Sequence, residues 1–110
     1  MTDVHALCAG MPAAVLTFPF GEGTAVYKVG GRIFALMGAD RATSINLKAE
    51  PADVTGLVET YDGIERGYHM SKKHWITVQL DASLPPGLLE ELVEDSYDLV
   101  VDKLPARDRP

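Results

Sequence analysis

The chain has 110 residues and a mass of 11.9 kDa, which fits one domain. Hydrophobic residues make up 46% and charged residues 24%, so the chain carries enough apolar side chains to fold and disorder is not expected. No apolar run approaches the roughly 20 residues of a membrane span, and residues 1–5 lack the pattern of a secretory signal. We expect a cytoplasmic, single-domain protein that spans residues 1–110.

The charge of the chain is distributed unevenly. Ten bases and sixteen acids give a formal net charge of −6. Residues 21–80 carry seven charges of each sign, whereas residues 81–110 carry eight acids and three bases. Bulk charge gives such a chain no nonspecific affinity for DNA, because that affinity comes from neutralising phosphates. A nucleic-acid-binding patch must therefore be local, and the middle of the chain is where it is expected.

The N-terminal part of the sequence predicts a short helix followed by a loop. Residues 3–11 place apolar side chains on one helical face, and Thr2 or Asp3 can cap that helix. Residues 17–23 are rich in proline and glycine, which is typical of a loop. We expect the two phenylalanines of this loop to anchor it to the core.

Three strands are predicted next. Residues 25–29 and 32–37 flank Gly30 and Gly31, and two glycines between β-rich runs indicate a type I′ hairpin, since both turn positions need positive φ. Residues 43–48 alternate between apolar and polar side chains, which is typical of a half-buried antiparallel strand.

The second half of the chain predicts two helices and one further strand. Residues 51–61 form a helix that begins at a proline, residues 64–73 a polar loop, and residues 74–80 an alternating strand with Thr77 facing outward. Residues 85–104 form the last helix. The order α-β-β-β-α-β-α predicts an α+β fold with a largely antiparallel sheet of about four strands and helices packed on one face.

The most informative segment is residues 67–75, which combine two lysines, two histidines and two large aromatic residues. Lysines contact phosphates, and Tyr68 and Trp75 offer rings on which bases can stack. Lys28 and Lys48, which the alternation places on the outward face of the sheet, would extend this surface. The alternative is that Lys72 and Lys73 solvate a turn, while the aromatic rings pack against the hairpin.

The sequence offers no convincing metal site or nucleophile. His69 and His74 are five residues apart without a third ligand beside them. The single cysteine, Cys8, lies on the apolar face of the first predicted helix without a base that the sequence identifies, so we expect a small buried side chain. His5 is expected at the surface. Because no phosphate loop, hydrolase motif or paired-carboxylate cleft is present either, we expect neither a cofactor nor catalytic activity.

Acidic residues follow one another along the last predicted helix. Such a ridge of like charges repels itself mildly, and it could bind divalent cations weakly, attract a basic protein, or simply keep a helix face solvated. The residues of this ridge are Glu90, Glu91, Glu94, Asp95, Asp98 and Asp102.

Four strings of residues resemble the MmcQ/YjbR family of small bacterial proteins, in the family's order and over nearly the whole chain. They begin with Phe18-Pro19-Phe20-Gly21 and the hairpin at 25–36, and continue with residues 67–75, 81–85 and 96–100. The sequence departs from the family at residues 11–16, where a glycine and an acidic residue are usual, so no role of an acid carries over there.

The resemblance implies a fold similar to the bacterial frataxin CyaY and a DNA-binding role through a "double wing" motif. No catalytic residue carries over from the family. The implied nucleic-acid-binding residues, together with Lys48 from the strand pattern, are Lys28, Arg32, Tyr68, His69, Lys72, Lys73, His74 and Trp75.

Three hypotheses follow from the sequence. The first is a nucleic-acid-binding module that uses the basic-aromatic segment and has DNA as its partner. The second is a protein- or ligand-binding module that uses the Trp75 face or the acidic C-terminal helix. The third is a frataxin-like binder of divalent cations on the acidic ridge.

Overall fold

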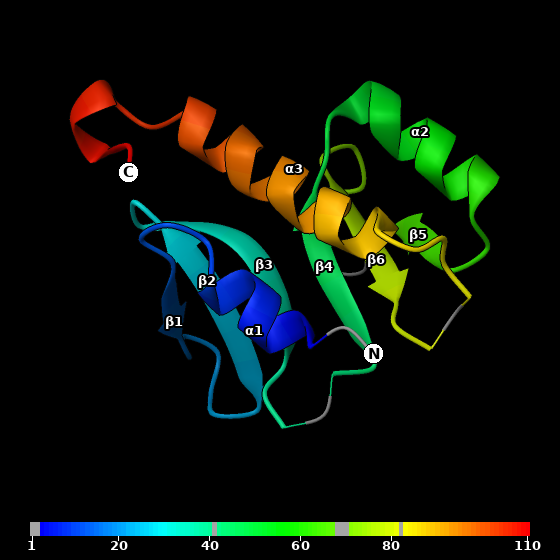
Figure 1. Ribbon diagram of the computed structural model, residues 1–110, viewed down its shortest axis with the longest axis horizontal. Helices are drawn as coiled ribbons and strands as arrows, with labels where there is room; N and C mark the ends of the chain where they lie inside the picture. The colour runs from blue at the N-terminus through cyan, green and yellow to red at the C-terminus, as the bar shows by residue number, and fades with distance from the viewer. Residues whose placement is uncertain (1–2, 41, 68–70, 82) are drawn as a thin grey trace.

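The computed structural model describes residues 3–40, 42–67, 71–81 and 83–110, and its elements form one antiparallel sheet with three helices (Figure 1). The sheet has six strands in the order β1-β2-β3-β4-β6-β5. The α+β class with an antiparallel sheet is therefore confirmed. In chain order the elements are α1 (Val4–Ala9), β1 (Val15–Thr17), β2 (Thr24–Val29), β3 (Arg32–Gly38), β4 (Ser44–Lys48), α2 (Pro51–Thr60), β5 (Ile64–Arg66), β6 (Trp75–Gln79), α3 (Leu88–Asp102) and the short 3-10 turn η1 (Ala106–Asp108).

The two strands absent from the prediction are the edge strands β1 and β5. Each has three residues, which is too short for an alternating pattern to stand out. The polar loop predicted at 64–73 is therefore wrong at its start, where β5 pairs with β6. The expectation that Phe18 and Phe20 anchor their loop to the core is also wrong, because both side chains are exposed.

The core lies between the sheet and the helices α1 and α3, which cover the same face of the sheet in Figure 1. Strand register places apolar side chains side by side on this face, and they are almost completely buried. One row across the sheet consists of Ala25, Met37, Ile45, Val78 and Ile64. The opposite face carries polar residues such as Asn46. Thr77, expected to face outward, is only 5% exposed, and its hydroxyl donates to Asn46 Oδ1 at 2.6 Å.

The helix boundaries follow from capping. The Asp3 carboxylate accepts from the Ala6 amide at 3.1 Å, which confirms a cap at the start of α1. The last helix begins at Leu88 and not at residue 85, because Gly87 adopts a left-handed φ of 84° that ends the preceding turn.

The β2–β3 hairpin has the predicted turn. Gly30 and Gly31 have φ values of 57° and 80°, which confirms that both positions are left-handed. Gly30 is also pressed against the end of α3, since a Cβ at this position would lie 2.5 Å from Leu104 Cδ1. The hairpin turn and the C-terminal end of α3 are therefore held together.

Ser96 on α3 connects the helix to two strands of the sheet. Its hydroxyl accepts from the Lys48 amide at 2.8 Å and donates to the Phe34 carbonyl at 2.6 Å, and the side chain is fully buried. The β3–β4 pairing stops at Ala35 and Leu47, one residue short of these two groups. The hydroxyl thus replaces the next rung of the ladder and satisfies a donor and an acceptor that would otherwise be buried without partners.

Replacing Ser96 by alanine is expected to destabilise the protein strongly. The substitution leaves the Lys48 amide and the Phe34 carbonyl without their partner, and each buried unsatisfied group costs about 1–3 kcal/mol. We expect the free energy of unfolding, measured by urea denaturation, to fall by about 2–4 kcal/mol. The control Ser83→Ala, at an exposed position, should change it by less than about 0.5 kcal/mol. Equal stability of the two variants would show that the hydroxyl bridge is not structural.

Candidate functional site

Strand direction brings the cations of the chain to one end of the sheet. In an antiparallel sheet of this order, β2, β4 and β5 end where β3 and β6 begin. The C-terminal end of α3 reaches the same place, because Leu104 contacts the hairpin turn at Gly30. We call this part of the molecule the basic end. Its cations are Lys28, Arg32, Lys48, Arg66, Lys72, Lys73 and Lys103.

The opposite end of the sheet carries the reverse charge. The connections β1–β2, β3–β4, α2–β5 and β6–α3 all lie there, and each contributes one carboxylate. These carboxylates are Glu22, Asp40, Asp62 and Asp81. Arg41, in one of these connections, lies outside the described residues. Three of the carboxylates of residues 21–80, Glu22, Asp40 and Asp62, thus lie at the end opposite the cations, whereas Glu50 follows Lys48 at the basic end.

Burial, two cations and one carboxylate act on Lys48 at the end of β4. Burial lowers the pKa of Lys48, and the neighbouring charges of Lys103 and Arg32 lower it further, while Glu50 acts in the opposite direction. Two elements far apart in sequence, the end of α3 and the start of β3, therefore both add positive potential at the end of β4.

The segment before β6 is held by backbone hydrogen bonds. The amide of Trp75 donates to the Ser71 carbonyl at 3.0 Å, and the amide of Gly67 donates to the Trp75 carbonyl at 2.8 Å. Lys72 Nζ donates to the Gly67 carbonyl at 3.3 Å. Trp75, whose ring is predicted to stack on bases, is thus the first residue of β6 and lies opposite Lys48 of β4.

Exposure differs among the predicted residues. Arg32, Lys72, Lys73 and His74 are exposed, whereas Lys28, Lys48 and Trp75 are half-buried. Tyr68 and His69 lie outside the described residues. The structure therefore brings the described members of the predicted set to one end of the sheet.

The hydrogen bonds of the cations at the basic end do not neutralise their charge. Within the described ranges, their hydrogen bonds run to neutral acceptors: Lys72 to a backbone carbonyl, and Arg66 to the Thr55 hydroxyl at 3.3 Å. Strands lie about 4.8 Å apart, so a row of cations from β2 to β5 extends over about 19 Å. That length corresponds to the rise of about five to six base pairs of DNA.

Sequence reasoning missed two cations of this end, Arg66 and Lys103. The sequence pattern predicts a polar loop around Arg66, and Lys103 lies in the segment with the strongest negative balance. The apolar Ile64, followed by two charged residues and Gly67, is a weak signal for a short edge strand that ends at Arg66. Nothing in the local sequence of Lys103 indicates that the end of α3 reaches the hairpin.

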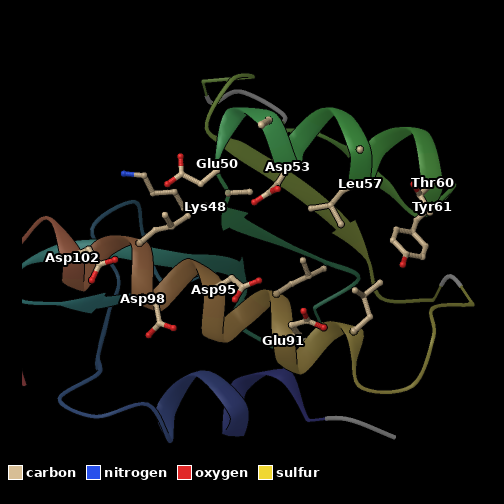
Figure 2. A pocket seen from close by; sticks show the side chains of 16 residues that line it. Lys48, Glu50, Asp53, Leu57, Thr60, Tyr61, Glu91, Asp95, Asp98 and Asp102 are labelled. Carbon is tan, nitrogen blue, oxygen red and sulfur yellow. The ribbon is translucent and has the colours of Figure 1, made fainter.

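The acidic ridge predicted for the last helix is divided by the structure. Four of its carboxylates line a groove of about 640 Å³ between α2 and α3, together with apolar side chains that include Leu57 and Leu92 (Figure 2). The four carboxylates in the groove are Glu91, Asp95, Asp98 and Asp102. The other two residues of the ridge, Glu90 and Glu94, do not line it.

Asp95 is the carboxyl group of this groove whose pKa is clearly changed by its surroundings. Partial burial raises its pKa, and the charges of Glu91, Asp98, Asp53 and Glu94 raise it further. Over the part of the chain that the structure describes, no three potential metal ligands come together as a binding cluster. The divalent-cation hypothesis therefore has no preformed site among these residues.

Two residues of α1, Cys8 and His5, face the interior of the fold. Cys8 is fully buried, which confirms the structural expectation, and burial raises the pKa of its thiol to about 12. His5, expected at the surface, connects α1 to the sheet: its Nδ1 lies 2.9 Å from the Tyr27 hydroxyl and its Nε2 lies 3.0 Å from the Gly38 carbonyl. Because a carbonyl only accepts, Nε2 is the protonated nitrogen, which leaves the neutral ring's Nδ1 as an acceptor for Tyr27.

Replacing Gly67 with a larger residue is expected to disturb the packing of Trp75 at the basic end. A Cβ at this position would lie 2.8 Å from Trp75 Cβ and 3.2 Å from the Trp75 carbonyl oxygen, and the strand cannot move away without breaking its pairing. We expect Gly67→Ala to lower the free energy of unfolding by about 1–3 kcal/mol and to shift the fluorescence of the single tryptophan. In contrast, Gly56→Ala adds a Cβ that meets nothing within 4 Å in α2, and should stabilise by about 0.5–1 kcal/mol. A Gly67→Ala variant with native stability and emission would show that this contact is loose.

Neutralising Asp95 is expected to stabilise the protein at neutral pH. A carboxyl group whose pKa is raised by folding disfavours the folded state once it is ionised, so the penalty is present above its folded pKa and disappears as the pH falls through it. Thermal unfolding of Asp95→Asn at pH 7 should show a gain of a few tenths of a kcal/mol per like-charge neighbour, and the gain should vanish in acid. Glu59→Gln, an exposed α2 position outside the groove, serves as the control. A loss of stability in Asp95→Asn would contradict the assigned repulsion.

Comparison with known proteins assigns the chain to a family. A family model described as YjbR matches residues 9–99. The chain is 41% identical over 104 residues to the uncharacterized protein YbdF of Escherichia coli O157:H7, covering 94% of this chain and 85% of that protein. It is 32% identical over 83 residues to the uncharacterized protein YjbR of Escherichia coli strain K12, covering 74% and 70%.

Solved structures agree with this assignment. The crystal structure of Deinococcus radiodurans protein DR2400, with a DUF419 domain, is similar at a TM-score of 0.88 and 36% identity over 96% of this chain and 82% of that one. A Pseudomonas syringae protein is similar at a TM-score of 0.73 and 26% identity over 91% and 99%. Among the described residues, no helix has the length and apolarity to cross a membrane. The expected resemblance is confirmed, and the chain belongs to the YjbR family.

Proposed function

We propose that this protein binds nucleic acid through the basic end of its sheet and does so without catalysis. The observation that supports the proposal best is the separation of charge along the strands. A molecule with a net charge of −6 repels a phosphate backbone as a whole, but the basic end presents a row of cations whose hydrogen-bond acceptors are neutral. The carboxylates of the acidic end lie at the other end of the strands and set the orientation of approach.

The role of the individual residues follows from their positions. Arg32, Lys72 and Lys73 are exposed and would contact phosphates. Trp75 is half-buried and its Cα partner is Lys48, so a base that stacks on the exposed part of the ring face would place its phosphate beside a cation. Tyr68 and His69, in the same segment of sequence, remain predicted contributors. A cytoplasmic location, where nucleic acids are accessible, accords with the proposal.

The groove between α2 and α3 favours a second candidate function, the binding of a basic protein segment. Its acidic rim and apolar side chains, such as Leu57 and Leu92, suit a segment with positive and apolar residues. The groove meets the basic end at Lys48, which lines the groove beside Glu50, so each surface is tested by residues that lie outside the other, such as Lys72 and Lys73 for the basic end.

Removing two lysines tests the nucleic-acid proposal. Fluorescence anisotropy with labelled single- and double-stranded oligonucleotides should give affinities that fall with salt, with a log–log slope of roughly −4.5 for five phosphate contacts on duplex DNA. The double variant Lys72→Ala with Lys73→Ala should bind more weakly and flatten the slope by about 2, because two contacts are lost.

A charge-matched control separates a local from a bulk effect. Thr43→Glu with Thr60→Glu lowers the net charge by the same amount as the lysine variant, but at exposed positions away from the basic end. This control should retain most of the affinity. No binding at low salt, or equal losses in the two double variants, would contradict a binding surface at the basic end.

A further inference from the structure

The two edges of the sheet are built differently. The β5 edge ends in the exposed charges Glu65 and Arg66 and is packed against α2. The β1 edge, which Figure 1 shows on the outer side of β2, carries no charged side chain in Val15–Thr17. Exposed charges and covering helices are the usual means by which edge strands avoid pairing with other chains, and β1 has no such charge.

Exposed apolar side chains gather at the same edge. Within the described residues, the large hydrophobic side chains that are exposed are Val15 at 56%, Leu16 at 45%, Phe18 at 46% and Phe20 at 67%. All four lie within six consecutive residues, on β1 and in the loop that follows it. A cluster of this kind on a single edge marks an interaction surface, because scattered exposed hydrophobic residues would carry no such meaning.

The absence of charge around β1 indicates what the edge binds. Between Asp3 and Glu22 the sequence contains no Asp, Glu, Lys or Arg, although 24% of the chain is charged. Two copies of a molecule with a net charge of −6 repel each other over most of their surfaces. The β1 edge is a place where they can meet without opposing like charges, whereas a charged partner would gain nothing there.

We propose that β1 is a self-association edge, at which two copies of the chain pair their β1 strands antiparallel about a two-fold axis. In such a pair Leu16 meets its own counterpart near the axis, and Val15 of one copy lies opposite Thr17 of the other. The result is one continuous sheet with six strands from each copy. Phe18 and Phe20 follow the paired strands and cover the joint.

The proposed dimer leaves the basic ends accessible. Because the two β1 strands run in opposite directions, the basic ends lie at opposite margins of the joined sheet. Arg32, Lys72 and Lys73 lie outside the contact, and Lys28, the Cα partner of Val15, is one strand away from it. Self-association is therefore independent of the proposed nucleic-acid binding, and either can fail while the other holds.

Sedimentation equilibrium of the full chain over a range of concentrations tests this edge. The wild-type protein should reach a mass of twice 11.9 kDa as its concentration rises. Leu16→Lys places a charge next to its own copy and should weaken the dimer at least tenfold, with an unchanged circular dichroism spectrum. Phe20→Ser, outside the strand, tests the same joint if the strand variant fails to fold. The control Ala52→Lys adds the same charge at an exposed α2 position and should leave the dimer intact.

Two results would overturn the proposal. One is a wild-type chain that stays monomeric up to millimolar concentration, which would leave the edge to a strand of a different protein. The other is a dimer that persists unchanged in both Leu16→Lys and Phe20→Ser, which would place the contact elsewhere on the molecule.

Discussion

The Ser96 hydroxyl is the interaction on which the arrangement of this molecule depends. It sits where β3 and β4 stop pairing, and it satisfies the Phe34 carbonyl and the Lys48 amide at the same time. Helix α3 is thereby fixed to two strands at a defined position along its length. The end of the helix then meets the hairpin turn, where Gly30 leaves room for Leu104. Through these two contacts, residues from three distant parts of the sequence gather their positive charges in one place.

The charge distribution shows why net charge is a poor guide to the partners of a small domain. Formal charge places this chain among proteins that phosphate repels. Antiparallel pairing, however, sends alternate connections to opposite ends of the sheet, and here four connections that each carry a carboxylate go to one end. The turns at the other end consist of Gly30-Gly31, a short link into α2 that carries Glu50, and the lysine-bearing segment before β6. Local potential is therefore a result of strand order, which composition does not contain.

Much of the fold could be predicted because local signals are strong there. The glycine pair predicts its hairpin, and the alternation around Ile45 and Val78 predicts the central strands. The edge strands could not be predicted, since three residues carry no period. Hydrophobicity predicts that Phe18 and Phe20 pack on the core, but both follow a three-residue edge strand and are exposed. The contribution of Lys103 to the site could not be foreseen either, because it depends on how α3 docks.

The most direct measurement is a backbone amide NMR titration of the full chain with a short, unlabelled oligonucleotide at low salt. If the strand register creates the binding surface, chemical shift changes will concentrate at Arg32, at residues 71–75 and at Lys103, and will be absent around Glu22, Asp40, Asp62 and Asp81. Changes that centre on the acidic connections or on the groove between α2 and α3, or no changes at all, would contradict it.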